Sequence, residues 1–393
     1  MHHPDTLVVT TGRDSERFGG LVNTPVFRGS TILVPSFDAW EECKRDGNPY
    51  AHYGRFGTET TRAFESAIAE LEGGYASLVF PSGLSACTHA VMAFVAAGDH
   101  ILITDNVYGP TRMFADRVLT RMGVEVEYFN PIEVEDLTSK LRKNTSVVFV
   151  ESPGSLTFEI SDIRAVSNAA HSVGAKVLLD NTWATPLYFK PFDHGVDISI
   201  QAATKYIVGH SDALLGTATA NEGAWEQLQA SAHDFGETAG PDDIFLGLRG
   251  IRSLSVRLQR HWENGLALAQ CLQTHPAVAQ VHHPALVNDP SHDLWKRDFR
   301  GASGLFSLQL KSTDIERVRC FFNSLKHFGI GLSWGGYESL VLPIGKPSRT
   351  VKSWERSGYL VRVHAGLENL NDLQSDVIQA LDQVVAKISV TVA

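Results

Sequence analysis

Short apolar segments of strand length alternate with helical patterns between residues 60 and 200, and this alternation limits the possible folds most. The strand-like segments lie at residues 77–80, 101–104, 124–129, 147–150, 177–180 and 197–200. The spacing of apolar residues predicts helices over 60–71, 84–97, 114–122 and 163–173. Strands that alternate with helices of this length are typical of βαβ units. The pattern therefore predicts a parallel sheet covered by helices on both faces.

The two ends of the chain depart from this pattern. Residues 1–54 have weak periodicity and many turn residues, which predicts an arm that packs on the body or on another subunit. A long helix at 258–272, a half-exposed strand at 306–310 and a helical stripe near the C-terminus predict a smaller α+β domain. We therefore expect an arm over 1–54, a large domain over 55–250 and a small domain over 251–393.

Composition limits the partners and the cellular location. Of the 393 residues, 43% are hydrophobic and 20% are charged, which is typical of a soluble globular protein. A formal net charge of −10 disfavours nucleic acid and anionic membranes as partners. We find no apolar run near the ~18 residues of a membrane span and no signal-peptide pattern at residue 1. We expect a cytoplasmic protein with a small-molecule partner.

Two features that could suggest other chemistry are better explained by packing. The four cysteines, at 43, 87, 271 and 320, are far apart and lack Cys-x-x-Cys spacing, which argues against a zinc site or a disulfide framework. His210, Ser211 and Asp212 are consecutive, so they are a poor basis for a catalytic triad. We expect no metal and no hydrolase triad.

Small and polar residues follow the predicted strands, where ligands bind in an open parallel sheet. Ser82 and Gly83 open a predicted helix, and free backbone N–H groups at a helix start can bind an anion. The Gly-x-Gly-x-x-Gly pattern and the P-loop are absent, so a single phosphate is the expected anion. Tyr108 follows the 101–104 strand, where its ring could stack on a planar ligand.

A carboxylate and a lysine complete this set of strand-end residues. Asp180 ends the 177–180 strand, and a buried carboxylate needs a cationic or donor partner. Lys205 follows the 197–200 strand, and a desolvated lysine becomes nucleophilic. Alone, these residues are explained as a helix cap and an exposed lysine. Together with the phosphate site they are what pyridoxal phosphate requires: a Schiff-base lysine and a carboxylate on the pyridine nitrogen.

Ten stretches, spread over nearly the whole chain, resemble the Cys/Met-metabolism family of pyridoxal-phosphate enzymes, and the cystathionine β-lyase branch in particular. They are Tyr53-Gly-Arg55, Leu71-Glu-Gly-Gly74, Phe80-Pro-Ser-Gly83, Glu151-Ser-Pro-Gly154, Asp180-Asn-Thr-Trp183, Ala202-Ala-Thr-Lys205-Tyr206, Gly209-His-Ser-Asp212, Leu248-Arg-Gly-Ile-Arg252, Ser333-Trp-Gly-Gly336 and Val361-Arg362. The resemblance implies an α/β fold of the aspartate-aminotransferase-like type (fold type I), with a mainly parallel seven-stranded sheet in the cofactor-binding domain.

The resemblance also implies a role for each site residue. Lys205 would bind the cofactor covalently and later shuttle protons, Asp180 would pair with the pyridinium nitrogen, and Tyr108 would stack on the ring and contact the substrate. Other residues would bind the two ends of the ligands. The phosphate would be held by Gly83, Leu84 and Thr204, and by Tyr53 and Arg55 of a neighbouring subunit; the substrate would be held by Arg362, Ser333 and Trp334. The shared site implies a homo-oligomer, in this family usually a homotetramer.

Three positions depart from the family pattern. Ala203 stands where many relatives have a serine, so one phosphate hydroxyl is missing. Leu332 replaces a tyrosine of the β-lyase branch, and it also differs from the glutamate of many γ-acting relatives. Phe56 stands where a β-lyase can have a second arginine, which leaves the recognition of the far end of the substrate open.

The resemblance implies β-elimination at a carbon–sulfur bond, in which cystathionine gives homocysteine, pyruvate and ammonia. A β-lyase for other cysteine S-conjugates is an alternative, made plausible by Phe56. Cystathionine γ-synthase and γ-lyase are further alternatives, and γ-elimination would give 2-oxobutyrate. A regulator that binds pyridoxal phosphate without turnover is the alternative from another class, although the sequence shows no appended basic helix-turn-helix.

Overall fold

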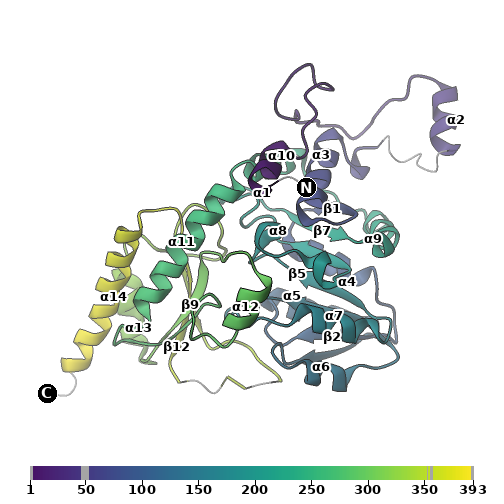
Figure 1. Ribbon diagram of the computed structural model, residues 1–393. Helices are drawn as coiled ribbons and strands as arrows, with labels where there is room; N and C mark the ends of the chain where they lie inside the picture. The colour runs from purple at the N-terminus through teal and green to yellow at the C-terminus, as the bar shows by residue number, and fades with distance from the viewer. Residues whose placement is uncertain (1–2, 46–52, 352, 355–356, 391–393) are drawn as a thin grey trace.

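A computed structural model describes residues 3–45, 53–351, 353–354 and 357–390 (Figure 1). Its larger sheet has seven strands in the order β1-β7-β6-β5-β4-β2-β3. Their bounds are β1 Ala76–Phe80, β2 His100–Thr104, β3 Glu125–Phe129, β4 Thr145–Glu151, β5 Lys176–Asp180, β6 Ile198–Gln201 and β7 Gly216–Ala220. Only β7 runs antiparallel to its neighbours, β1 and β6. The mainly parallel sheet is therefore confirmed.

Helices cover both faces of this sheet, as the alternation predicted. The helices of this part are α3 Glu59–Glu72, α4 Gly83–Met92, α5 Gly109–Phe114, α6 Val134–Lys140, α7 Ile163–His171, α8 Thr185–Tyr188 and α9 Glu222–Phe235. Residues of α4 and α9 share one core cluster with Ile101 and Phe149, whereas residues of α6 and α7 share another with Leu102 and Val148. Alternate residues of one strand thus enter opposite cores, which explains the continuous apolar runs.

Strand β7 has no counterpart among the segments identified from the sequence. Its residues, Gly-Thr-Ala-Thr-Ala, lack the large apolar side chains that mark the other strands. A Cβ at Gly216 would lie 2.2 Å from the Ser82 carbonyl oxygen and 2.9 Å from the Ala86 Cβ. The strand is therefore built from small residues because α4 packs closely on it.

Two predicted helices differ from the observed ones. The helix expected over 84–97 ends at Met92, and Phe94 is still buried after the helix has ended. The helix expected over 114–122 starts earlier, as α5, and continues as a π turn over Ala115–Leu119 and a 3-10 turn over Thr120–Met122. Gly123, at φ +84°, ends it in the left-handed conformation that glycine adopts readily.

The C-terminal part forms a second sheet of five strands, in the order β10-β11-β12-β9-β8. The strands are β8 Val278–His282, β9 Leu305–Leu310, β10 Gly329–Ile330, β11 Leu340–Gly345 and β12 Tyr359–His364; the helices are α11 Leu254–Leu272, α12 His292–Asp298, α13 Ile315–Ser324 and α14 Leu370–Val390. The expectation of a half-exposed strand at 306–310 was wrong. Ser307 and Gln309 are buried along with Phe306, because β9 pairs with β8 and β12 and Gln309 bonds to the Ser357 carbonyl.

The N-terminal segment packs on the body at one end and projects from it at the other (Figure 1). Helix α1 (Pro4–Thr10) contacts α3 and α11, and Arg28 bonds to Asp242 of α10 (Pro241–Ile251). Leu33 and Phe37, the first residue of α2 (Phe37–Arg45), are 87% and 74% exposed. Residues 1–2 and 46–52 of the expected arm lie outside the described residues. The boundaries near 54 and 250 stay a prediction. No helix among the described residues could span a membrane.

Candidate active site

Four of the predicted site residues lie at the carboxyl ends of the parallel strands. Asp180 is the last residue of β5, and Lys205 lies four residues after β6. Gly83 begins α4 shortly after β1, and Tyr108 caps α5 after β2. Since β1, β2, β5 and β6 point the same way, their ends share one edge of the sheet, where ligands of such sheets bind.

Lys205 is held by residues that lie between β10 and β11. Its Nζ donates to the Ser333 Oγ at 2.7 Å and lies 5.5 Å from the centre of the Trp334 ring. Burial, and then the positive charge of Arg362, lower the pKa of Lys205 to about 8, although Asp180 acts in the opposite direction. Near neutral pH most of this lysine is still protonated, but the free amine, which is the nucleophilic and basic form, is far more abundant than for a lysine of ordinary pKa.

Asp180 is buried and held by three donors. It accepts the Thr182 N–H at 3.0 Å, the Thr182 hydroxyl at 2.5 Å and, on its other oxygen, the Cys87 thiol at 3.8 Å. Burial raises the pKa of Asp180, while these hydrogen bonds and Lys205 oppose the rise. A cationic nitrogen beside this carboxylate would offset its desolvation, so the residue fits a pyridinium partner.

A second carboxyl at the strand ends, the half-buried Glu151, lies beside Asp180 and was missed by the sequence reasoning. It ends β4 in register with Asp180 on β5. Its oxygens accept the Tyr108 N–H at 2.5 Å and the Ser155 hydroxyl at 2.6 Å. Burial, and then the negative charge of Asp180, raise the pKa of Glu151 well above its usual value. Its place at a strand end was the available signal, although the Glu-Ser-Pro-Gly stretch was used only for the resemblance.

The start of α4 can form the phosphate site. A Cβ at Gly83 would lie 2.4 Å from the Ala202 Cβ, so only glycine fits here, and the Ser82 side chain caps the helix by accepting the Ser85 N–H. The first N–H groups of a helix, here those of Gly83 and Leu84, have no acceptor within the helix. Together with Asp180 and Lys205, this cradle fits pyridoxal phosphate.

The structure shows different surroundings for Thr204 and Ala203. The Thr204 hydroxyl donates to the Leu215 carbonyl at 3.0 Å and accepts the Leu215 N–H at 2.9 Å, so its proton is directed away from any phosphate. Thr204 thus joins the loop that follows β6 and carries Lys205 (the lysine loop) to Leu215, the residue before β7. Ala203 is fully buried in a core cluster with Tyr206, so its side chain faces the core and not the strand-end cluster.

Arg362 and His364 of β12 hold the turn that carries Ser333. Ser333 has φ +77°, an unfavourable conformation for a non-glycine residue. Arg362 donates to the Ser333 carbonyl at 2.8 Å, and the Gly335 N–H donates to the His364 Nε2 at 3.1 Å. His364 was missed by the sequence reasoning. The signal was its position two residues after Arg362, which places both on one face of a strand.

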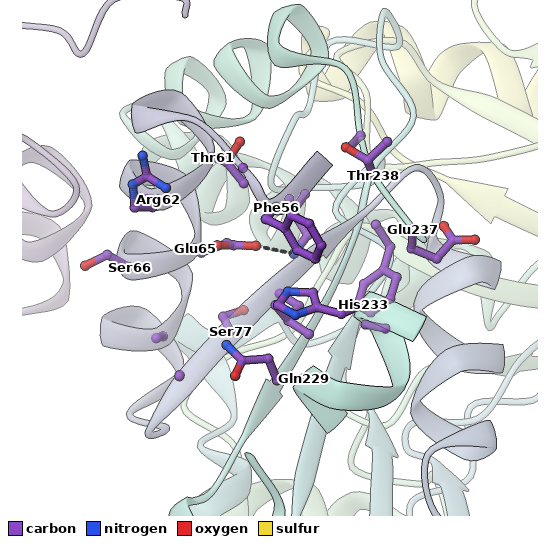
Figure 2. Close-up of a pocket in the computed structure, with 18 of the residues that line it drawn as sticks. Phe56, Thr61, Arg62, Glu65, Ser66, Ser77, Gln229, His233, Glu237 and Thr238 are labelled. Atoms are coloured by element: carbon purple, nitrogen blue, oxygen red, sulfur yellow. Dashed lines mark hydrogen bonds between the residues drawn. The ribbon is translucent and has the colours of Figure 1, made fainter. Parts of the chain in front are cut away.

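Tyr53, Arg55 and Phe56 lie apart from the contacts of Lys205. They belong to a short 3-10 turn, Gly54–Phe56, and to the residue before it. The Arg55 guanidinium lies over the rings of Tyr53 and Phe56, at 5.1 and 4.9 Å, and the Phe56 ring meets the His233 ring edge-on at 4.9 Å. Figure 2 shows Phe56 and His233 pointing into a cavity of about 430 Å³ between α3, β1 and α9.

This cavity is separate from the strand-end cluster, since neither Lys205 nor Asp180 lines it. Its polar lining includes Glu65, whose carboxylate accepts the Val79 N–H of β1. Two further site residues are exposed, since Tyr108 and Leu332 are 44% and 80% exposed. Within one chain, the structure thus brings together Lys205, Asp180, Ser333, Trp334, Arg362 and Tyr108, and leaves Tyr53 and Arg55 outside the cluster.

Comparison with known proteins identifies relatives along almost the whole chain. Relatives named cystathionine β-lyase, one of them provisionally, are 37–47% identical. The enzyme of Escherichia coli is 41% identical over 390 residues, which cover 97% of this chain and 98% of the relative. An L-alanine/L-glutamate racemase of Wolbachia pipientis is 38% identical over 390 residues, covering 96% of both chains.

The solved structures agree in fold. Cystathionine γ-synthase from Xanthomonas oryzae, in complex with aminoacrylate and cysteine, superimposes with a TM-score of 0.90 at 30% identity. The match covers 98% of this chain and 99% of that one. The family model described as Cys/Met metabolism PLP-dependent enzyme matches residues 5–382. The expected fold type and the resemblance are both confirmed, and the chain belongs to the Cys/Met-metabolism family of pyridoxal-phosphate-dependent enzymes.

Proposed function

We propose that this protein is a carbon–sulfur β-lyase that cleaves L-cystathionine to homocysteine, pyruvate and ammonia. The observation that carries the proposal is the hydrogen bond between Lys205 and Ser333, which holds an amine whose pKa is lowered by burial and by Arg362 and raised by Asp180. Relatives named cystathionine β-lyase, at 37–47% identity, support the choice of reaction.

The side chains divide the work of this reaction between them. When bound, pyridoxal phosphate supplies an electron sink for a negative charge at the substrate Cα. Asp180 carries the charge that pairs with the ring nitrogen, and Lys205 Nζ accepts the Cα proton and returns it to a leaving group. Arg362 binds the substrate carboxylate with its two-donor fork, and Ser333 orients the Lys205 amine.

The remaining assignments belong to the same proposal. Gly83 and Leu84 bind the phosphate through their N–H groups, and Thr204 supports the lysine loop beside it. Tyr108 stacks on the cofactor ring, and Trp334 forms a wall of the substrate site next to Lys205. All four cysteines are free, which supports a cytoplasmic location, since thiols stay reduced there.

Product analysis tests the reaction. Purified protein is incubated with L-cystathionine, with other cysteine S-conjugates and with L-alanine, and the keto acid, thiol and enantiomers are identified. We expect pyruvate and homocysteine in equal amounts from cystathionine. Release of 2-oxobutyrate would instead indicate γ-elimination, and racemised alanine without keto acid would indicate a racemase. Lys205→Ala should abolish product and the visible absorbance of the bound cofactor, whereas the exposed Lys311→Ala should retain both.

The far end of the substrate is the part of the proposal that Phe56 affects. A phenyl ring in place of a second arginine offers an apolar surface and no charge, which favours cysteine conjugates with an apolar thiol. A ratio of kcat/KM above 1 for such a conjugate over cystathionine would make that lyase the function. The reverse ratio would support cystathionine as the substrate.

We further propose a homotetramer in which Tyr53 and Arg55 reach the phosphate site of a neighbouring subunit. Their separation from Lys205 in one chain and the exposure of Leu33 and Phe37 support this assembly. Mixing two inactive variants tests it. Lys205→Ala and Arg55→Ala subunits should regain activity together, because a mixed pair contains one site with both residues intact. Absence of recovery in verified mixed oligomers would show that Arg55 does not act across subunits.

A further inference from the structure

The loop over residues 346–351 follows β11 and contacts residues beyond the ends of β2 and β4 in the larger sheet, through Arg349, Thr350 and Val351. These contacts lie four to six residues after the end of β11, the strand that pairs with β12. They bind two carboxylates that the proposed mechanism does not use, the buried Asp105 and the half-buried Glu159.

Asp105 is the first residue after β2 and is 1% exposed. Its carboxylate accepts the Thr350 N–H at 2.9 Å, the Thr350 hydroxyl at 2.8 Å and the Val351 N–H at 3.1 Å. The buried Arg112 also donates to it at 2.7 Å. Burial raises the pKa of Asp105, but these hydrogen bonds outweigh it and leave the pKa below its usual value. The loop is thus bound to a charged group, and such hydrogen bonds are the strong ones.

Arg349 makes the second contact. Its guanidinium, with a side chain only 6% exposed, donates to Glu159 at 2.8 Å. The same carboxylate accepts the Asn106 side-chain N–H at 3.3 Å. Burial of Glu159 is outweighed by the charge of Arg349, so the pKa of this carboxyl is lowered. Asp105 is therefore bonded directly to Thr350 and Val351. Its neighbour Asn106 is linked to Arg349 through the carboxylate of Glu159.

The same turn leads to Tyr108. Asn106 accepts the Ser155 N–H through its carbonyl at 2.9 Å, and the Tyr108 N–H is held by Glu151. A shift at Asp105 would therefore move the turn that positions the Tyr108 ring. On the other side, β12 carries Arg362, which pairs with Leu342 of β11. Residues 349–351 are thus bonded to the turn that leads to Tyr108, and they follow the strand that pairs with the strand of Arg362.

We infer that Arg349 and Thr350 are positioning residues for the substrate. They fasten the strand pair that carries Arg362 to the turn that carries Tyr108, and so fix the distance between the carboxylate-binding group and the stacking ring. The roles of Arg362 and Tyr108 rest on the proposed function, whereas the bonds to Asp105 and Glu159 do not depend on it. The alternative is a staple that only stabilises the fold.

Kinetics separate these two roles. In the holoenzyme, Arg349→Gln combined with Thr350→Val removes the Arg349 bond to Glu159 and the Thr350 hydroxyl bond to Asp105. The double variant should raise KM for the amino-acid substrate at least about tenfold, because loss of a single hydrogen bond to a charged group accounts for about that factor. The kcat and the cofactor absorbance should stay within about twofold, because the groups at the reacting atoms are unchanged. Arg319→Gln, which removes an exposed ion pair with Glu316 on α13, is the matched control and should change nothing.

Hydrogen exchange supplies a readout that does not depend on catalysis. In the double variant, amides over 105–109 should exchange about tenfold faster than in the parent, and the control should not. Glu159→Gln breaks the Arg349 pair from the large-domain side and should give the same result if the double variant fails to fold. A lower melting temperature with unchanged KM and unchanged exchange at 105–109 would overturn the inference. A parent protein without lyase activity would overturn the proposed function, yet the exchange result would still decide whether the loop holds the Tyr108 turn.

Discussion

Replacing Lys205 with methionine should stabilise the cofactor-free protein at neutral pH while it abolishes activity. The reason is that the lysine is held in a place that disfavours its charge. Its pKa falls from 10.5 to about 8, through burial first and Arg362 second. Methionine keeps an unbranched apolar side chain in the same space and carries no charge.

The expected gain follows from the change in pKa. At about 1.4 kcal/mol per pKa unit, the fall from 10.5 to about 8 corresponds to about 3 kcal/mol. Loss of the hydrogen bond to Ser333 costs the variant about 1 kcal/mol, so its net gain in the free energy of unfolding is about 2 kcal/mol at pH 7. Below pH 8 both the folded and unfolded chains are protonated, so the lysine destabilises the fold fully. Between pH 8 and 10.5 the unfolded chain binds more protons, so the parent protein gains stability as pH rises and the difference disappears.

Thermal unfolding of the cofactor-free proteins at pH 7 and pH 10 measures this difference. The Lys205→Met variant should melt several degrees above the parent at pH 7 and no higher than the parent at pH 10. Lys311→Met, at an exposed position, controls for the loss of a lysine and should show no such pH dependence. A variant that is less stable at pH 7, or whose advantage is equal at both pH values, would refute the account of a desolvated lysine.

Three further changes test other parts of the site and the core. Gly83→Ala should lower cofactor affinity about tenfold in a fluorescence titration, since its Cβ would lie 2.4 Å from that of Ala202 and overpacking costs about 1–3 kcal/mol; Gly109→Ala, at another helix start with open space, should not. Asp180→Asn should keep bound cofactor but lower lyase turnover by about a hundredfold or more, because a charge that stabilises the reacting state is lost; near-normal turnover would contradict its role. Glu72→Gln should stabilise the protein by up to about 3 kcal/mol at pH 8 and not at pH 4.5, because burial raises the pKa of Glu72 from 4.5 to about 7. The buried carboxyl costs stability only above pH 4.5, where the unfolded chain loses its proton first, so melting temperatures at the two pH values test the prediction.

The sequence predicted those parts of the fold that follow from local pattern. Most strands with large apolar residues were found because their alternate residues enter the two cores, whereas the edge strand β3 was found from its alternating pattern. Strand β7 was missed because close packing of α4 at Gly216 demands small residues, which carry no strand signal. The exposure of β9 was wrong because burial of Ser307 and Gln309 depends on neighbouring strands and on the loop at Ser357. Those contacts join residues that are distant in the sequence.

The same division holds for the site. Asp180 and Lys205 could be predicted because the ends of parallel strands meet at one edge of a sheet. Arg362 lies on a strand of the second sheet and Ser333 in a turn between two of its strands, so only the family resemblance placed them beside Lys205. His364 and Glu151 were missed because they act on backbone N–H groups of Gly335 and Tyr108, and a sequence does not show which N–H a side chain will meet.

The two sheets therefore share control of one amine. Asp180 of the large sheet raises the pKa of Lys205, whereas Arg362 of the small sheet lowers it. Arg362 is also the group that would bind the substrate carboxylate, and a bound carboxylate would offset its positive charge. The pKa of Lys205 would then rise, which makes the free amine a stronger base once a substrate is in place to give up its Cα proton. With the proposed roles of Arg362 and Lys205, the placement of Arg362 and Asp180 on two sheets would couple substrate binding to base strength without any group dedicated to that purpose.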